Sequence, residues 1–176
     1  LVCAGLLLRS IKHLFAVDPG FDSTHLLTMQ VQEASRRFND DSARARFFSQ
    51  ALEAVRAVPG VTAAAFTNQL PLSGDIAVYN MQLEAHSDEN SEGLLQYAVS
   101  PAYFDTMKIP LRGGRLLDEG DRAGAPTAVL ISESFARRKF PNQTPIGQRV
   151  RIGAAVGHVD RSWATIVGVV AHVKET

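Results

Sequence analysis

The stretch TAVLISESFARRKF, residues 127–140, places an apolar strand directly before a helix. Residues 127–131 have the continuous apolar character of a buried strand. Ser132 is suited to cap the helix predicted over residues 133–140, because a serine side chain can accept a hydrogen bond from a free N–H group of the first turn. A strand joined to a helix in this way indicates a mixed fold in which helices pack on a sheet.

Elements on both sides of this stretch complete one predicted lobe, about residues 94–176. Gly168, inside the last apolar run, indicates a bulge or a close approach of another backbone. The other expected elements are a strand at 94–100, a helix at 101–107, an extended segment at 109–117, and a hairpin of strands at 148–152 and 164–173.

A first lobe is predicted at about residues 23–85. Asp40 and Asp41 supply N-cap chemistry for an amphipathic helix at 42–58, and Pro59-Gly60 ends it. Strands are expected on either side of this helix and at the end of the lobe, at 26–31, 61–67 and 78–85. The predicted fold class is therefore α+β, with two small mixed lobes: a strand-helix-strand lobe and a second α+β lobe.

The N-terminal residues have the character of a membrane segment. Residues 1–8 are apolar, and the run ends at Arg9. About twenty apolar residues are needed to cross a bilayer, so we expect residues 1–16 to be the end of a transmembrane helix and its stalk. Leu7, Ile11 and Leu14 recur at helical spacing, which an amphipathic N-terminal helix of a soluble domain would show equally.

The charge balance and the cysteine content argue against several classes of protein. Eighteen basic residues balance eighteen acidic ones, so composition gives no electrostatic footprint for nucleic acid or an anionic membrane surface. Cys3 is the only cysteine, and therefore no intrachain disulfide can form. Val2 before it does not fit a lipoprotein signal, where a small residue is expected.

Motifs for enzymatic chemistry are missing from the sequence. No Gly-Lys pair of a P-loop occurs, and neither a dinucleotide fingerprint nor a Gly-x-Ser-x-Gly elbow is present. Asp118, Glu119 and Asp121 lie together in a glycine-rich loop, where neighbouring carboxylates are usually only solvated. We therefore expect no catalytic residues and no cofactor-binding residues.

Metal-binding patterns are equally weak. The five histidines form no His-x-x-x-His pair; they are His13, His25, His86, His158 and His172. The segment 88–93 imitates the first half of a calcium loop, but its twelfth position is Val99 instead of a bidentate glutamate. We expect no metal site.

Ten phrases, in order along nearly the whole chain, resemble the MacB-like periplasmic core domain of ABC transporter permeases, often found beside an FtsX-like permease domain. They are LLLRS (6–10), VDPGFD (17–22), VPGV (58–61), LPLSG (70–74), VSPAYF (99–104), IPLRGGR (109–115), VLISESFARR (129–138), FP (140–141), PIGQRV (145–150) and IVGVV (166–170). Each phrase alone is turn and core chemistry, but together they are specific.

The resemblance implies a domain between the first and second transmembrane helices, located at the inner membrane on its periplasmic or extracytoplasmic side. The family's domain continues past the IVGVV strand, so we expect residues 17–176 to be a core domain truncated at its C-terminus. The implied role is non-catalytic: coupling a cytoplasmic ATPase cycle to substrate export or to mechanical transmission.

The resemblance also implies partners: an ABC ATPase reached through cytoplasmic parts outside this chain, a second permease copy in a homodimer, and an extracytoplasmic protein. Nucleic acid is not expected. A membrane-anchored ligand-binding or sensory domain is the alternative, because it could share the same N-terminal helix and mixed layout. An extracytoplasmic hydrolase is the least favoured, because no convergent site is visible.

Overall fold

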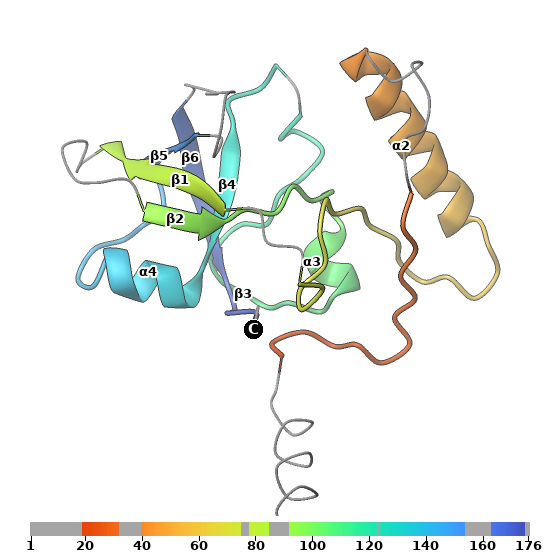
Figure 1. Ribbon diagram of the computed structural model, residues 1–176, viewed down its shortest axis with the longest axis horizontal. Helices are drawn as coiled ribbons and strands as arrows, with labels where there is room; N and C mark the ends of the chain where they lie inside the picture. Colours follow the sequence, from red (N-terminus) through yellow and green to blue (C-terminus); the bar gives the residue numbers. More distant parts are fainter. Residues whose placement is uncertain are drawn as a thin grey trace, which may run out of the picture.

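The computed structural model describes residues 19–31, 40–74, 78–84, 92–122, 124–153 and 163–174. Among them, one mixed sheet of six strands is the main element (Figure 1). The strands are β1 (Val78–Leu83), β2 (Glu92–Leu95), β3 (Leu111–Gly114), β4 (Ala128–Ser132), β5 (Arg149–Gly153) and β6 (Trp163–Val170). The helices are α2 (Asp41–Arg56), α3 (Tyr103–Thr106) and α4 (Glu133–Lys139). The predicted α+β fold class is confirmed.

Strand β6 is the centre of the sheet. It pairs antiparallel with β5 along its first half and with β3 along its second half, while β4 runs parallel to it on the other side. β1 and β2 extend the sheet beyond β5, giving the order β2-β1-β5-β6-β3. The predicted β5–β6 hairpin is therefore confirmed.

Gly168 is where the ladders of β6 become irregular, as the sequence indicated. Both the β3–β6 and the β4–β6 registers shift beside it. A Cβ atom at Gly168 would lie 2.3 Å from the carbonyl oxygen of Arg115 and 2.8 Å from a methyl carbon of Leu130. Only glycine lets the segment that follows β3 come this close to β6.

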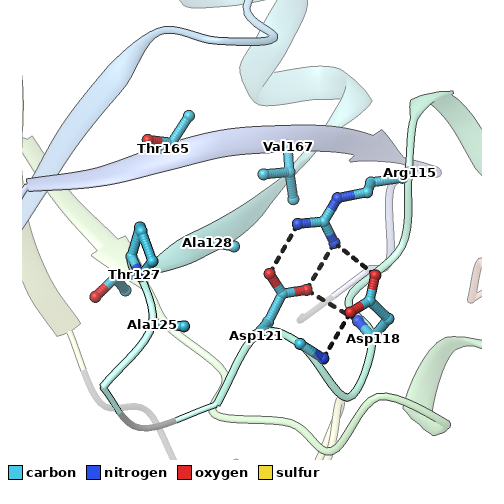
Figure 2. Close-up of a pocket in the computed structure, with 10 residues that line it drawn as sticks. Arg115, Asp118, Asp121, Ala125, Thr127, Ala128, Thr165 and Val167 are labelled. Carbon is cyan, nitrogen blue, oxygen red and sulfur yellow. Dashed lines mark hydrogen bonds and ion pairs between the residues drawn. The ribbon is translucent and has the colours of Figure 1, made fainter.

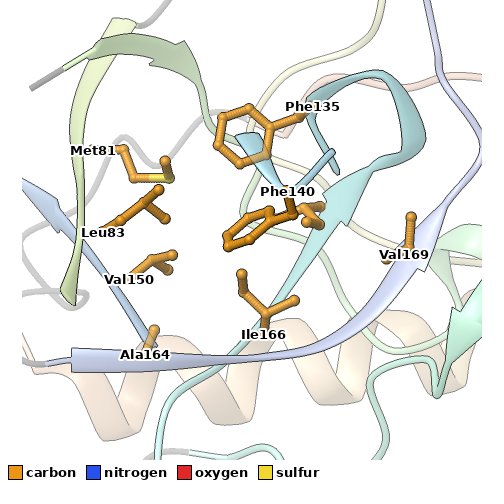
Figure 3. Close-up of a cluster of buried hydrophobic side chains, with 9 residues drawn as sticks. Met81, Leu83, Phe135, Phe140, Val150, Ala164, Ile166 and Val169 are labelled. Atoms are coloured by element: carbon orange, nitrogen blue, oxygen red, sulfur yellow. The ribbon is translucent and has the colours of Figure 1, made fainter. Parts of the chain in front are cut away.

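Helix α4 forms as the opening stretch predicts. The Ser132 hydroxyl accepts a hydrogen bond from the N–H of Phe135 at 3.3 Å, which caps the first turn. Phe135 and Phe140 then point into the core on one face of the sheet, against Ile166, which is fully buried (Figure 3). The other buried members of this core are Met81, Leu83, Ile131, Val150, Ala164 and Val169.

A second buried cluster lies on the opposite face, where α3 packs near the end of β6. Its buried members are Tyr103, Phe104, Met107, Ile109, Val170 and Ala171. Leu130 packs here while its neighbour Ile131 belongs to the first core, because successive side chains of a strand point to opposite faces. The sheet is thus covered on both faces at this end.

Helix α2 confirms the predicted amphipathic helix, with Asp40 as its cap: the Asp40 carboxylate accepts from the N–H of Ser42 at 3.0 Å. The helix contacts the segment after it through an edge-on pair of Phe48 and Phe66, 4.8 Å between ring centroids. Val55, on the predicted apolar stripe, remains exposed. The stripe is therefore only partly covered by the described residues.

Two predicted strands of the first lobe are wrong. Residues 26–31 and 61–66 form no ladder with any described strand, and Thr67 makes only an isolated bridge to Val99. Leu27 and Met29 are 92% and 76% exposed, and residues 27–31 all lie in solvent, whereas Leu26 packs on the second buried cluster. A strand requires a partner, and none of the described residues supplies one.

The predicted division into lobes stays a prediction. β1 was assigned to the lobe at 23–85, yet it pairs with β5 of the lobe at 94–176. The predicted strand at 94–100 also begins earlier, as β2 at Glu92, and ends at Leu95. The expected membrane and stalk segment, residues 1–16, lies outside the described residues.

Candidate functional site

The segment of residues 19–22 is fixed to two distant parts of the chain. The N–H of Lys174, just beyond β6, donates to the carbonyl oxygen of Pro19 at 2.9 Å. The N–H of Asp22 donates to the carbonyl oxygen of Met107, after α3, at 3.0 Å. We call these three segments, residues 19–22, 107–108 and 172–174, the junction.

Gly20 makes the close approach in the junction possible. Its φ is +85°, a left-handed conformation that side chains with a Cβ rarely adopt. A Cβ atom here would also lie 2.2 Å from the carbonyl oxygen of His172, which is backbone and cannot rotate away. The Pro19-Gly20 pair is typical of a turn, but no local pattern indicates its partner 152 positions away in the chain.

An ion pair supports the same contact. The Nζ atom of Lys108 donates to Oδ2 of Asp22, and the N–H of Thr24 donates to Oδ1 at 2.8 Å. The Lys108 hydrogen bond, followed by that of Thr24, holds the pKa of the Asp22 carboxyl well below its usual range. Because Lys108 is largely exposed, the pair orients the segment more than it stabilises it.

Apolar packing makes the junction part of the folded body. Phe21 packs on the cluster that includes Tyr103, Met107 and Val170. The backbone hydrogen bonds of Pro19 and Asp22 thus flank a partly buried side chain that packs on this cluster. A displacement of residues 19–22 would be passed to α3 and to the end of β6 together.

A second group of polar side chains surrounds a hollow beside β6 (Figure 2). The guanidinium of Arg115 donates two hydrogen bonds to the carboxylate of Asp121, of 2.6 and 2.8 Å. The N–H of Asp118 donates to the same carboxylate at 2.9 Å. The hollow measures about 320 Å³, and Thr127, Thr165 and Val167 are among the other residues that line it.

This arrangement corrects one sequence interpretation. Asp121 was expected to be merely solvated, but its side chain is only 11% exposed and is bound by Arg115. The Arg115 hydrogen bonds, with that of Asp118, lower the pKa of Asp121 to about 2. Arg115 also donates its backbone N–H to the carbonyl oxygen of Val167, so its two hydrogen bonds to Asp121 hold the loop against β6.

A serine-histidine contact could not be predicted from the sequence. The Ser134 hydroxyl lies 2.9 Å from Nδ1 of His172 and 3.1 Å from the hydroxyl of Ser132. The two partners are 38 positions apart, and no local pattern could have signalled their meeting. Since the Ser132 hydroxyl also caps α4, this contact ties α4 to the junction.

The other sequence candidates are placed as follows. His13, His86, His158, Cys3 and residues 88–91 of the calcium-like segment lie outside the described part of the chain. Within the described part, no three His, Cys, Asp or Glu side chains are grouped so that they could hold a metal ion. That same part contains no helix of the length and apolarity needed to cross a membrane.

Comparison with known proteins identifies the family of the chain. The MacB-like periplasmic core domain family matches residues 8–176. No curated protein matches the chain.

Two solved structures share the fold. One is the periplasmic region of MacB from Actinobacillus actinomycetemcomitans, with 17% identity, a TM-score of 0.51, and coverage of 72% of this chain and 51% of that one. The other is the extracellular domain of the ABC-type transporter YknZ from Gram-positive bacteria, with 17% identity, a TM-score of 0.51, and coverage of 70% and 56%. The matched part thus spans about half the length of these relatives. On the match over residues 8–176, the chain belongs to the MacB-like periplasmic core domain family.

Proposed function

We propose that this chain is an extracytoplasmic domain of an ABC-type transporter permease, and that it passes on movement of the adjoining membrane helix. In this proposal a cytoplasmic ATPase drives the movement, two permease copies assemble in the inner membrane, and the domain relays the movement to a substrate or partner outside. The family supports this role, because the matched solved structures bear the names of ABC-type transporters or of MacB. No catalytic chemistry is needed for it.

The junction is the observation that carries the proposal. Pro19 and Asp22 are hydrogen-bonded to Lys174 and Met107, so residues 19–22 are attached to the segment that directly follows β6 and to the turn after α3. β6 is paired with three other strands. Movement delivered at residue 19 would therefore displace the sheet as a rigid body, which is how packed domains respond to a hinge or a lever.

The test uses the full-length permease, purified with its ATPase and reconstituted in vesicles. Arg46, exposed on α2, is replaced by a spin-labelled cysteine in both permease copies, and the distance between labels is measured with and without trapped ATP. We expect ATP to shift the distance distribution. ATP hydrolysis is recorded in parallel.

Two glycine variants make the test specific to the junction. Gly20→Val places a side chain against the His172 carbonyl, whereas Gly60→Val adds one at a similar φ with nothing within 4 Å. We expect the ATP-dependent shift to be lost in the first variant and kept in the second. Failure of any ATPase to copurify, or a shift caused by a small ligand without ATP, would favour the sensory alternative.

A further inference from the structure

Charge is distributed unevenly over the folded chain, although its net charge is zero. Four segments meet on the side of the molecule that holds the junction: residues 19–22, 105–112, 133–139 and 172–174. We call this side the basal face; it is the lower side of the molecule in Figure 1, with α4, β3 and the segment that begins at residue 19. Its basic residues are Lys108, Arg112, Arg137, Arg138, Lys139 and Lys174, and its acidic residues are Asp22, Asp105 and Glu133.

Contacts between these segments show that they form one surface. Arg112 of β3 lies 3.8 Å from the carboxylate of Glu133 in α4. α4 also meets His172 through Ser134, as described above, and Lys174 meets Pro19. The basal face is therefore continuous from α4 through β3 to the junction.

Two basic side chains of the basal face extend further into solvent than the acidic side chains that they pair with. The side chains of Lys108 and Arg137 are 66% and 69% exposed, whereas those of Asp22 and Glu133 are 34% and 36% exposed. With six basic and three acidic residues, the face carries a net charge of +3 with histidine neutral, and the rest of the chain carries −3. The described residues of this side thus carry a positive net charge.

We propose that the basal face rests on an anionic phospholipid surface. Charge complementarity favours this partner, because clustered lysine and arginine side chains next to a membrane are attracted to anionic headgroups within a Debye length. The inference depends on the proposed function, which places residue 19 close to the membrane. Composition alone indicated no such attraction, because it averages charge over the whole chain.

The contact would give the domain a resting position. Attraction to the anionic headgroups keeps the basal face on the membrane surface, while the junction keeps residues 19–22 attached to the folded domain. Tilting or lifting of the domain would then have to separate the basic side chains from the headgroups. The strength of the resting state would depend on the anionic lipid content and on salt.

The test measures flotation of the whole chain with phospholipid vesicles. One set contains phosphatidylcholine only and the other adds phosphatidylglycerol. Apolar insertion by residues 1–8 contributes to both sets and is subtracted. We expect excess binding to the anionic vesicles, and its loss in 1 M salt, where the Debye length is about 3 Å.

Two triple variants with equal charge change locate the contact. Arg112→Gln, Arg137→Gln and Arg138→Gln neutralise the basal face, and binding to anionic vesicles should fall on the order of 100-fold. The control triple variant removes three basic residues elsewhere: Arg44→Gln, Arg46→Gln and Arg122→Gln. Circular dichroism confirms that both variants fold, and the control should keep most of the binding.

Three results would overturn the inference: equal losses in the two triple variants, no excess binding to anionic vesicles, or basal-face-dependent binding to soluble polyglutamate without vesicle binding. The last result would assign the face to an acidic protein. Each of them leaves the ATP-dependent distance shift as a separate measurement, so failure of the lipid contact is distinguishable from failure of the proposed function.

Discussion

Replacing Gly20 with alanine should weaken the junction. The expected loss of folding stability has two parts, and the structure gives the origin of each. The first is conformational: a residue with a Cβ at a φ of +85° costs about 1–2 kcal/mol. The second is steric: the new Cβ would be 2.2 Å from the His172 carbonyl oxygen. Such overpacking costs about 1–3 kcal/mol.

Relief of this contact has a further structural consequence. The two backbones must separate by about 1 Å for the Cβ to reach an ordinary distance from the oxygen. A movement of that size stretches the bond from Lys174 N–H to the Pro19 carbonyl from 2.9 Å past the range of a hydrogen bond. Gly20→Ala should therefore open the junction between residues 19 and 174.

Gly60→Ala is the matched control, because Gly60 has a φ of +91° and a Cβ there meets nothing within 4 Å. Both variants carry the conformational cost, and only Gly20→Ala carries the steric one. The difference of about 2 kcal/mol corresponds to a difference in Tm of about 4–8 °C for a chain of this size. Thermal denaturation followed by circular dichroism measures it, and faster hydrogen exchange at the Lys174 amide locates it.

Equal Tm values for the two variants would refute this reasoning. So would a larger loss in Gly20→Ala with unchanged exchange at Lys174, since the destabilisation would then arise somewhere other than the junction. A double variant adds a check: because Gly20 and Gly60 lie in different parts of the chain, their effects should add.

Three further predictions concern the sheet and the loop beside it. Gly168→Ala should lower the free energy of unfolding by about 2–4 kcal/mol, because its Cβ would meet the Arg115 carbonyl oxygen at 2.3 Å. Gly153→Ala is the control: its nearest contact is at 3.9 Å, so it should be neutral or slightly stabilising. Urea denaturation measures both. Asp121→Asn should flatten the pH dependence of stability: the folded pKa of about 2 lies below the unfolded value of about 3.9, so the native contribution is present above about pH 4 and is lost as the pH falls towards 2. Urea midpoints at pH 7, 4 and 3 would show that slope in the original chain, and an equal slope in Asp121→Asn would contradict it. Ile166→Ala should cost about 2–5 kcal/mol and Ile166→Val about 0.5–1.5 kcal/mol, because this side chain is 0% exposed; calorimetry that finds no gradation would contradict the packing described for it.

Local chemistry explains which elements could be predicted from the sequence. Asp40 and Ser132 cap the helices that follow them, and their caps are visible without knowledge of any other element. The period-two and continuous apolar patterns at β4, β5 and β6 likewise identify strands that are buried on the sheet. These are the predictions that the structure confirms.

Non-local pairing explains most of the rest. Residues 26–31 alternate as a strand should, with Leu27 and Met29 on one side, but an alternating pattern does not name a partner. The junction depends on Gly20 meeting His172, and the loop beside β6 depends on Arg115 reaching Asp121 instead of solvent. Each of these contacts follows from the three-dimensional arrangement of the sheet.

The position of the junction at the end of β6 decides how the domain would respond to tension. A pull applied along β6 through residues 172–174 acts in shear, so the hydrogen bonds to β3, β4 and β5 share the tension and must fail together. A pull across the sheet at β2, an edge strand paired only with β1 in the described sheet, would break its bonds one after another. The molecule is therefore mechanically stiff along one axis and weak along another, and residues 19–22 are attached to the stiff one.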